Sequence, residues 1–110
     1  MAKKFLTLLA ALFLVGCEQD SRAAADGYTF KEAEYEKTSL SVSIVQYDSR
    51  RDFIQGAKSV GANVEGLQAF AMISPNTNEC EIHIERIKVN YRPEWLGHEL
   101  THCIHGRWHP

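Results

Sequence analysis

The sequence predicts a small α+β domain with the element order β-α-β-β-α. Residues 39–45 alternate polar and apolar side chains, as a half-buried strand does. Two apolar segments, 67–74 and 80–89, flank the turn-forming sequence Pro-Asn-Thr-Asn at 75–78 and should pair as an antiparallel hairpin. Residues 93–105 carry apolar side chains at helical spacing, so we expect a C-terminal amphipathic helix.

Local signals predict where the two helices begin and end. Asp48 or Ser49 can cap the first helix, and Gly61 should end it because glycine is favoured just past a helix C-terminus. Pro93 suits the first position of the second helix, where no backbone N–H is needed. Gly106 should end that helix in the same way as Gly61 ends the first.

The first 16 residues are typical of a signal peptide. Two lysines precede a short apolar run, 5–15, which is too short to span a membrane as a mature helix. The run ends in Leu-Val-Gly-Cys at 14–17, which resembles the lipobox of bacterial lipoproteins. The resemblance implies cleavage before Cys17 and lipidation of that residue, so the mature protein would be membrane-anchored and extracytoplasmic. Glu18 in place of Asp slightly favours the outer membrane; an ordinary secretory peptide is the alternative.

This division gives a signal peptide at 1–16, a lipid-anchored tether at 17–37 and a metal-binding domain at 38–110. The tether is polar and Ala-rich, with a short helix expected within 30–36. The formal net charge of −2, without a basic stripe, argues against a nucleic-acid partner.

Cys80 and Cys103 remain for the domain, an even number in an oxidising compartment, which predicts a disulfide. It would close a loop of about 24 residues and stabilise the fold by roughly 3 kcal/mol in the chain-entropy model. The alternative is that Cys103 is a thiolate ligand beside His102. Helical spacing turns Cys103 away from His98, which favours the disulfide.

The second predicted helix contains the sequence His-Glu-Leu-Thr-His at 98–102, the H-E-x-x-H signature of zinc peptidases. Residues four apart stand on one face of a helix, so His98 and His102 can bind the same metal ion. Glu99 lies about 100° around the helix, where its carboxylate can act on water rather than on the metal. We therefore assign Glu99 as the catalytic base.

Catalytic zinc usually takes three protein ligands and leaves one position open. A turn at Gly106 would bring His109 back towards the metal. The string H-E-x-x-H-x-x-x-G-x-x-H resembles the metzincin signature with one extra residue before the glycine. We predict one Zn²⁺ held by His98, His102 and His109. His105 is a possible ligand in reserve, and His83 is expected on the sheet surface, where it could instead position a substrate.

The predicted element order resembles the N-terminal half of a zincin peptidase, and the strings C-E-I-H, G-H-E-L-x-H-C and G-x-W-H look like those of small metallopeptidase lipoproteins of phages and bacteria. This resemblance implies a peptide or protein substrate in the cell envelope, held along an edge strand. The strand at 80–89 is the expected edge.

Two functions follow from these patterns. The first is a zinc-dependent metallopeptidase that hydrolyses peptide bonds in the envelope, with Glu99 as base. The alternative is a non-catalytic zinc-binding envelope lipoprotein, of a bacterium or a phage, that acts on a partner protein. The intact Glu99 favours the peptidase, whereas the lack of an evident oxyanion donor favours the binding role.

Overall fold

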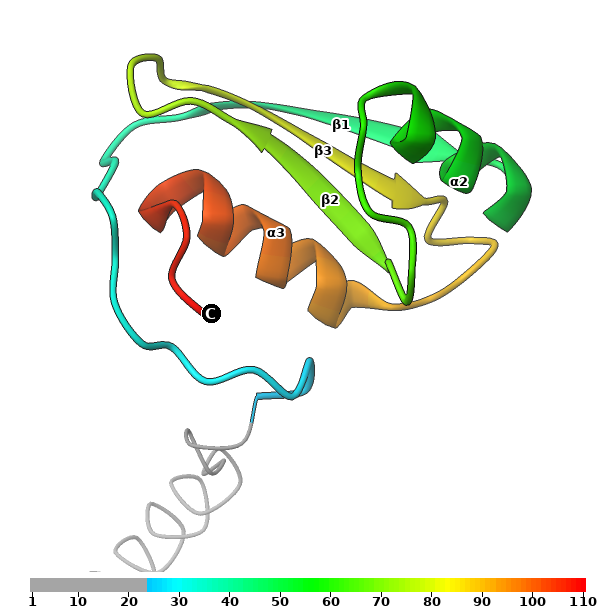
Figure 1. The fold of residues 1–110 in the computed structure, drawn as a ribbon, viewed down its shortest axis with the longest axis horizontal. Helices are drawn as coiled ribbons and strands as arrows, with labels where there is room; N and C mark the ends of the chain where they lie inside the picture. Colours follow the sequence, from blue (N-terminus) through cyan, green and yellow to red (C-terminus); the bar gives the residue numbers. More distant parts are fainter. Residues whose placement is uncertain (1–23) are drawn as a thin grey trace, which may run out of the picture.

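The computed structural model describes residues 24–110. Its elements are β1 (Ser41–Tyr47), α2 (Arg50–Ser59), β2 (Ala69–Ile73), β3 (Glu79–Glu85) and α3 (Pro93–His105), as Figure 1 shows. The predicted α+β class and element order are confirmed. The expected signal peptide, the lipidation site at Cys17 and the first part of the tether lie outside the described residues.

The three strands form one mixed sheet in the order β1-β3-β2. β3 pairs in parallel with β1 and antiparallel with β2, so the predicted hairpin is present. The expectation that the strand within 80–89 forms the edge is wrong, because β3 is central and β2 is an edge. The strand is also shorter than expected, ending at Glu85. Its Ile82 and Ile84 are only 1% and 3% exposed, and a strand with such apolar side chains takes the central, most buried position.

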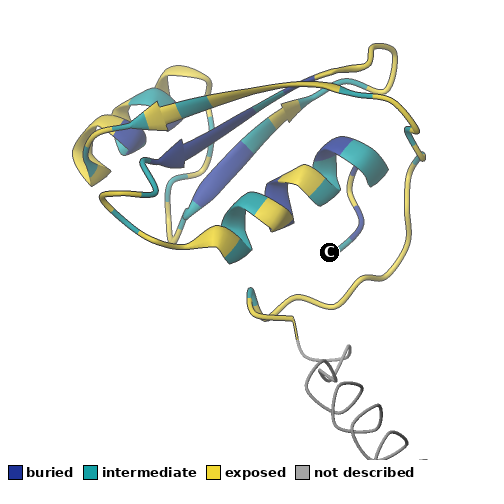
Figure 2. Cartoon of the chain, turned by 180° about the vertical axis from the view of Figure 1, so that it is seen from behind, coloured by how far each residue is buried: buried dark blue, intermediate teal, exposed yellow. Residues whose placement is uncertain are grey.

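The two helices pack against opposite faces of the sheet. Side chains alternate between the faces along a strand. Ile82 therefore packs with Cys103 under α3, whereas Phe70 packs with Phe53 and Ala57 under α2. Figure 2 shows that buried segments of the strands lie beneath the helices, and that exposed residues are far fewer on α3 than on α2.

The predicted helix boundaries agree with the structure to within one or two residues. The Ser49 hydroxyl accepts a hydrogen bond from the Asp52 N–H at 3.1 Å, which caps α2. The chain leaves α2 at Val60 and turns at Gly61, whose φ is 78°. Pro93 is the first residue of α3, and Gly106 follows its last.

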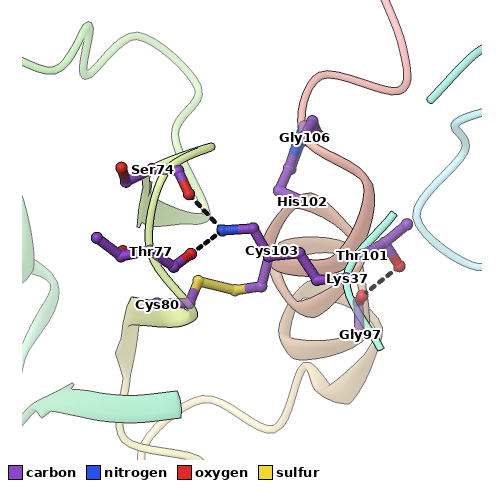
Figure 3. Close-up of a disulfide and its surroundings, with 9 residues drawn as sticks. All are labelled: Lys37, Ser74, Thr77, Cys80, Gly97, Thr101, His102, Cys103 and Gly106. Atoms are coloured by element: carbon purple, nitrogen blue, oxygen red, sulfur yellow. Dashed lines mark hydrogen bonds between the residues drawn. A yellow bond between two sulfur atoms is a disulfide. The ribbon is translucent and has the colours of Figure 1, made fainter. Parts of the chain in front are cut away.

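A disulfide joins Cys80 of β3 to Cys103 of α3 (Figure 3). The alternative interpretation of Cys103 as a thiolate ligand is therefore wrong. Beside the disulfide, the Lys37 ammonium donates to the carbonyls of Ser74 and Thr77 in the β2–β3 turn. These contacts attach both α3 and the segment before β1 to the same end of the sheet.

Residues 24–37, expected to be a tether, form a strap around the side of α3 that faces away from the sheet (Figure 1). The N–H groups of Lys31, Glu34 and Lys37 donate to the carbonyls of Trp108, His105 and Ile104 at 2.9–3.0 Å. A helix leaves its last four carbonyls without partners, and the strap supplies two of these with donors. The prediction of a helix within 30–36 is wrong, because the backbone N–H groups there bond to carbonyls of α3 and the tail rather than to one another.

None of the helices in the described range is long and apolar enough to cross a lipid bilayer.

Candidate metal centre

The predicted ligands, His98, His102 and His109, converge at one point. His98 and His102 stand one turn apart on α3, and His109 reaches them from the tail that follows Gly106. Their three Nε2 atoms form a nearly equilateral triangle. The separations are 3.2 Å for His98–His102, 3.0 Å for His102–His109 and 3.1 Å for His98–His109.

These separations match the requirements of a small divalent metal. Tetrahedral nitrogen ligands about 2.05 Å from zinc lie about 3.3 Å from one another. The histidine cluster is therefore able to hold one metal ion without rearrangement of its backbone.

The hydrogen bonds of the other ring nitrogens fix the protonation of the cluster. The three Nδ1 atoms face oxygens that can only accept: Asp26 Oδ2 at 2.7 Å, the Gly106 carbonyl at 2.8 Å and the Pro110 carbonyl at 3.0 Å. Each Nδ1 must therefore carry the proton, which leaves each Nε2 with a bare lone pair. Three lone pairs that converge within 3.2 Å repel one another unless a cation lies between them, so the chemistry of the donor set fits a metal.

Burial also favours neutral imidazoles at this centre. It lowers the pKa of His98, although the nearby Asp26 carboxylate acts in the opposite direction. It lowers the pKa of His102 as well, against the effect of the Gly106 carbonyl. Neutral imidazole is the form that binds metal.

Glu99 lies next to the cluster but does not belong to it. Its side chain points to another azimuth of α3 and is largely buried, at 7% exposure. Burial raises its pKa to about 7. The carboxyl makes no hydrogen bond to any residue in the described part of the chain, so it is free to bind water or a substrate.

The histidine cluster and Glu99 open onto a cleft of about 410 Å³. One wall is the edge strand β2 together with residues 65–68 before it, and the opposite wall is α3 with the tail. Because β2 pairs only with β3 in the described sheet, the backbone of its other edge is unpaired. The sheet edge that borders this cleft is β2, not the strand expected from the sequence at 80–89.

The remaining histidines lie apart from the centre. The ring of His105 packs edge-on against Phe30 at a centroid distance of 5.3 Å. His83 points to the α2 face of the sheet, where its two ring nitrogens contact Tyr47 Oη at 2.8 Å and Glu81 Oε1 at 2.5 Å. Phe70 stacks on it. Both nitrogens of His83 have partners, and its ring lies behind Phe70, which lines the cleft. The expectation of a surface position is wrong, because His83 is buried at 7% exposure.

Sequence reasoning missed the contribution of the strap to this centre. Asp26 contacts His98, and the Tyr28 ring lies against His98 and His109 at centroid distances of 4.7 and 4.4 Å. The only local signal is the Asp-Gly pair at 26–27, which is typical of a turn and precedes an aromatic residue. That turn exists, with Gly27 at φ 80° and the Tyr28 N–H donating to Asp26 Oδ1 at 3.0 Å.

The assembled residues offer three neutral imidazoles, a buried carboxyl with a raised pKa and an unpaired strand edge along one cleft. No protein family matches the chain, and no curated protein or solved structure is detectably similar to it. What this centre can do chemically follows from its own geometry: it can hold a Lewis-acidic metal and exchange a proton beside it.

Proposed function

We propose that the protein is a zinc-dependent peptidase with a zincin-like site. His98, His102 and His109 hold the metal, and Glu99 is the base. The observation that carries the proposal is the convergence of three unprotonated Nε2 atoms within 3.2 Å, beside a buried carboxyl group. A bound zinc would polarise the scissile carbonyl and acidify the attacking water.

Glu99 supplies the proton transfers. Its carboxylate accepts a proton from the attacking water and later delivers it to the leaving amine. A base works best when its pKa lies near the working pH, and burial raises the pKa of Glu99 to about 7. The low polarity that raises this pKa also strengthens the electrostatic interactions of the carboxylate with the reacting atoms.

The cleft suits an extended peptide. An unpaired strand edge can bind a peptide as an additional strand through backbone hydrogen bonds. Ala69 and Ala71 of β2 line the cleft, and their short side chains leave room for those of a substrate. The substrate class that we propose is therefore an extended segment of a peptide or protein.

The lipobox-like sequence supports an envelope location for this activity. If Cys17 carries a lipid, Asp26 lies nine residues beyond the anchor. Nine residues span at most about 30 Å when fully extended. The metal centre would then work close to the membrane surface, on peptide segments presented there.

One observation favours the alternative, a non-catalytic zinc-binding lipoprotein that acts on a partner protein. Arg107 lines the cleft and could stabilise an oxyanion, but its guanidinium pairs with both carboxylate oxygens of Glu34, at 2.9 and 3.1 Å. Glu34 takes up two of the five N–H donors of Arg107 and neutralises its charge, so Arg107 is a weaker oxyanion donor than an unpaired arginine would be.

The deciding experiment compares wild type with Glu99→Gln and His105→Ala. Zinc is measured by elemental analysis, and hydrolysis is measured on a peptide library. We expect about one zinc per chain in all three proteins, because neither substitution touches a ligand. Glu99→Gln should lose roughly 10²–10⁴-fold in rate, as expected for the loss of a general base. His105→Ala, altered on the same helix but outside the cluster, should keep its activity.

If wild type binds zinc but cleaves no peptide, the binding role is correct. If wild type binds no zinc, both functions are wrong.

A further inference from the structure

The strap contacts the histidine cluster through the Asp26 carboxylate as well as through the Tyr28 ring. Asp26 Oδ2 lies 2.7 Å from His98 Nδ1, and both side chains are nearly buried, at 9% and 5% exposure. Among the described residues, Asp26 is the only acidic residue with a hydrogen bond to one of the three ligands, since the Nδ1 atoms of His102 and His109 bond to backbone carbonyls.

We propose that Asp26 is a positioning residue for the metal centre, and that the strap is therefore part of the site rather than a tether. This inference rests on the proposed zinc site. The carboxylate accepts the Nδ1–H of His98, which holds the ring in the tautomer that offers Nε2 to the metal. A carboxylate in this position also makes the imidazole a stronger ligand than a carbonyl does.

Asp26 is itself held in place by local structure. Its second oxygen accepts the N–H of Tyr28, and Gly27 adopts a φ of 80° that closes the turn between them. The same turn lays the Tyr28 ring against His98 and His109. One short turn of the strap thus contacts two of the three ligands.

The rest of the strap binds the tail that carries His109. Lys31 donates to the Trp108 carbonyl, and Glu34 accepts the N–H of Arg107 at 2.6 Å. Both contacts lie within two residues of His109. Because the docked strap orders two ligands and the metal needs the same two in place, metal binding and strap docking stabilise each other.

The test measures zinc affinity by competition with a chelator, on the full chain in detergent. Asp26→Ala should weaken zinc binding by 10- to 100-fold, the usual effect of removing an outer partner of a metal-bound histidine. Asp26→Asn keeps the shape and one acceptor oxygen but loses the charge, and should fall between Ala and wild type. Asp48→Asn is the matched control. Asp48 is exposed and pairs with Arg86, so its substitution should leave zinc affinity unchanged.

A second readout separates positioning from a general structural role. Long-range ¹H–¹⁵N NMR spectra of the metal-free protein report which ring nitrogen carries the proton. We expect His98 to be protonated at Nδ1 in wild type and to become a mixture of tautomers in Asp26→Ala. Asp26 lines a cavity of about 660 Å³, so its truncation removes little packing and the fold should persist. If Asp26→Ala nevertheless unfolds, the zinc affinity and the His98 tautomer of Asp26→Asn test the inference instead.

The inference would be overturned, with the zinc site left intact, if both folded Asp26 variants bound zinc within twofold of wild type. Where Asp26→Ala unfolds, the same result for Asp26→Asn alone would overturn it. Failure of the wild type to bind zinc would instead refute the proposed function.

Discussion

Replacing Gly106 with alanine should disturb the metal centre through the backbone. Gly106 has φ 74° and ψ −137°, a conformation that is almost restricted to glycine. Forcing another residue into such a region costs about 1–3 kcal/mol. The added Cβ would also lie 2.9 Å from a ring carbon of Tyr35 and 3.0 Å from the Glu34 side chain. Relief of this overlap must move either the strap or the tail, and the tail carries His109.

Gly97→Ala is the natural control, because Gly97 lies in the interior of α3 and its added Cβ would meet no atom within 4 Å. Alanine there should stabilise the helix by roughly 0.5–1 kcal/mol. For a domain of this size, 1 kcal/mol shifts Tm by roughly 4–8 °C. We therefore expect Gly106→Ala to lower Tm by about 4–24 °C and Gly97→Ala to raise it by a few degrees.

Calorimetry and zinc titration of the two variants check this reasoning. Gly106→Ala should also bind zinc more weakly, whereas Gly97→Ala should bind it as wild type does. A Gly106→Ala protein with unchanged Tm and unchanged zinc affinity would show that neither the backbone conformation nor the strap contact holds His109 in place.

Two further outcomes are expected. The Cys80→Ser/Cys103→Ser double variant should lose about 3 kcal/mol of unfolding free energy in urea, as the chain-entropy model gives for a loop of this length; an unchanged unfolding midpoint would show that the bond adds nothing to stability. Cys17→Ser should move the protein from the membrane to the soluble fraction if the lipobox-like sequence directs lipidation, and wild-type protein that carries no lipid by mass spectrometry would contradict this assignment.

The parts of the structure that could be predicted are those encoded by neighbouring residues. The ends of α2 follow from Ser49 and Gly61, because capping and positive-φ turns involve only a few adjacent positions. The pairing of His98 with His102 follows from the helical repeat. His109 could be predicted as a third ligand because Gly106 predicts a sharp turn after the helix, and the structure has that turn.

The parts that could not be predicted depend on contacts between distant segments. A hairpin pattern indicates that β2 and β3 are neighbours, but it does not indicate which of them pairs with β1. The sequence of the strap predicts a tether, because the hydrogen bonds that dock it use backbone donors, which any sequence provides. The contact of Asp26 with His98 could not be predicted either, since no sequence spacing links two residues that are 72 positions apart.

The disulfide and the strap hold α3 from two different sides. Cys103 faces the sheet and fixes the helix to β3, while its neighbour His102 belongs to the metal cluster. The strap binds the last turn of α3 and the tail from the side away from the sheet. Since β2 forms the other wall of the cleft, reduction of the disulfide would remove one of the contacts that hold α3 at its distance from the sheet, while the apolar packing of α3 and the strap remain.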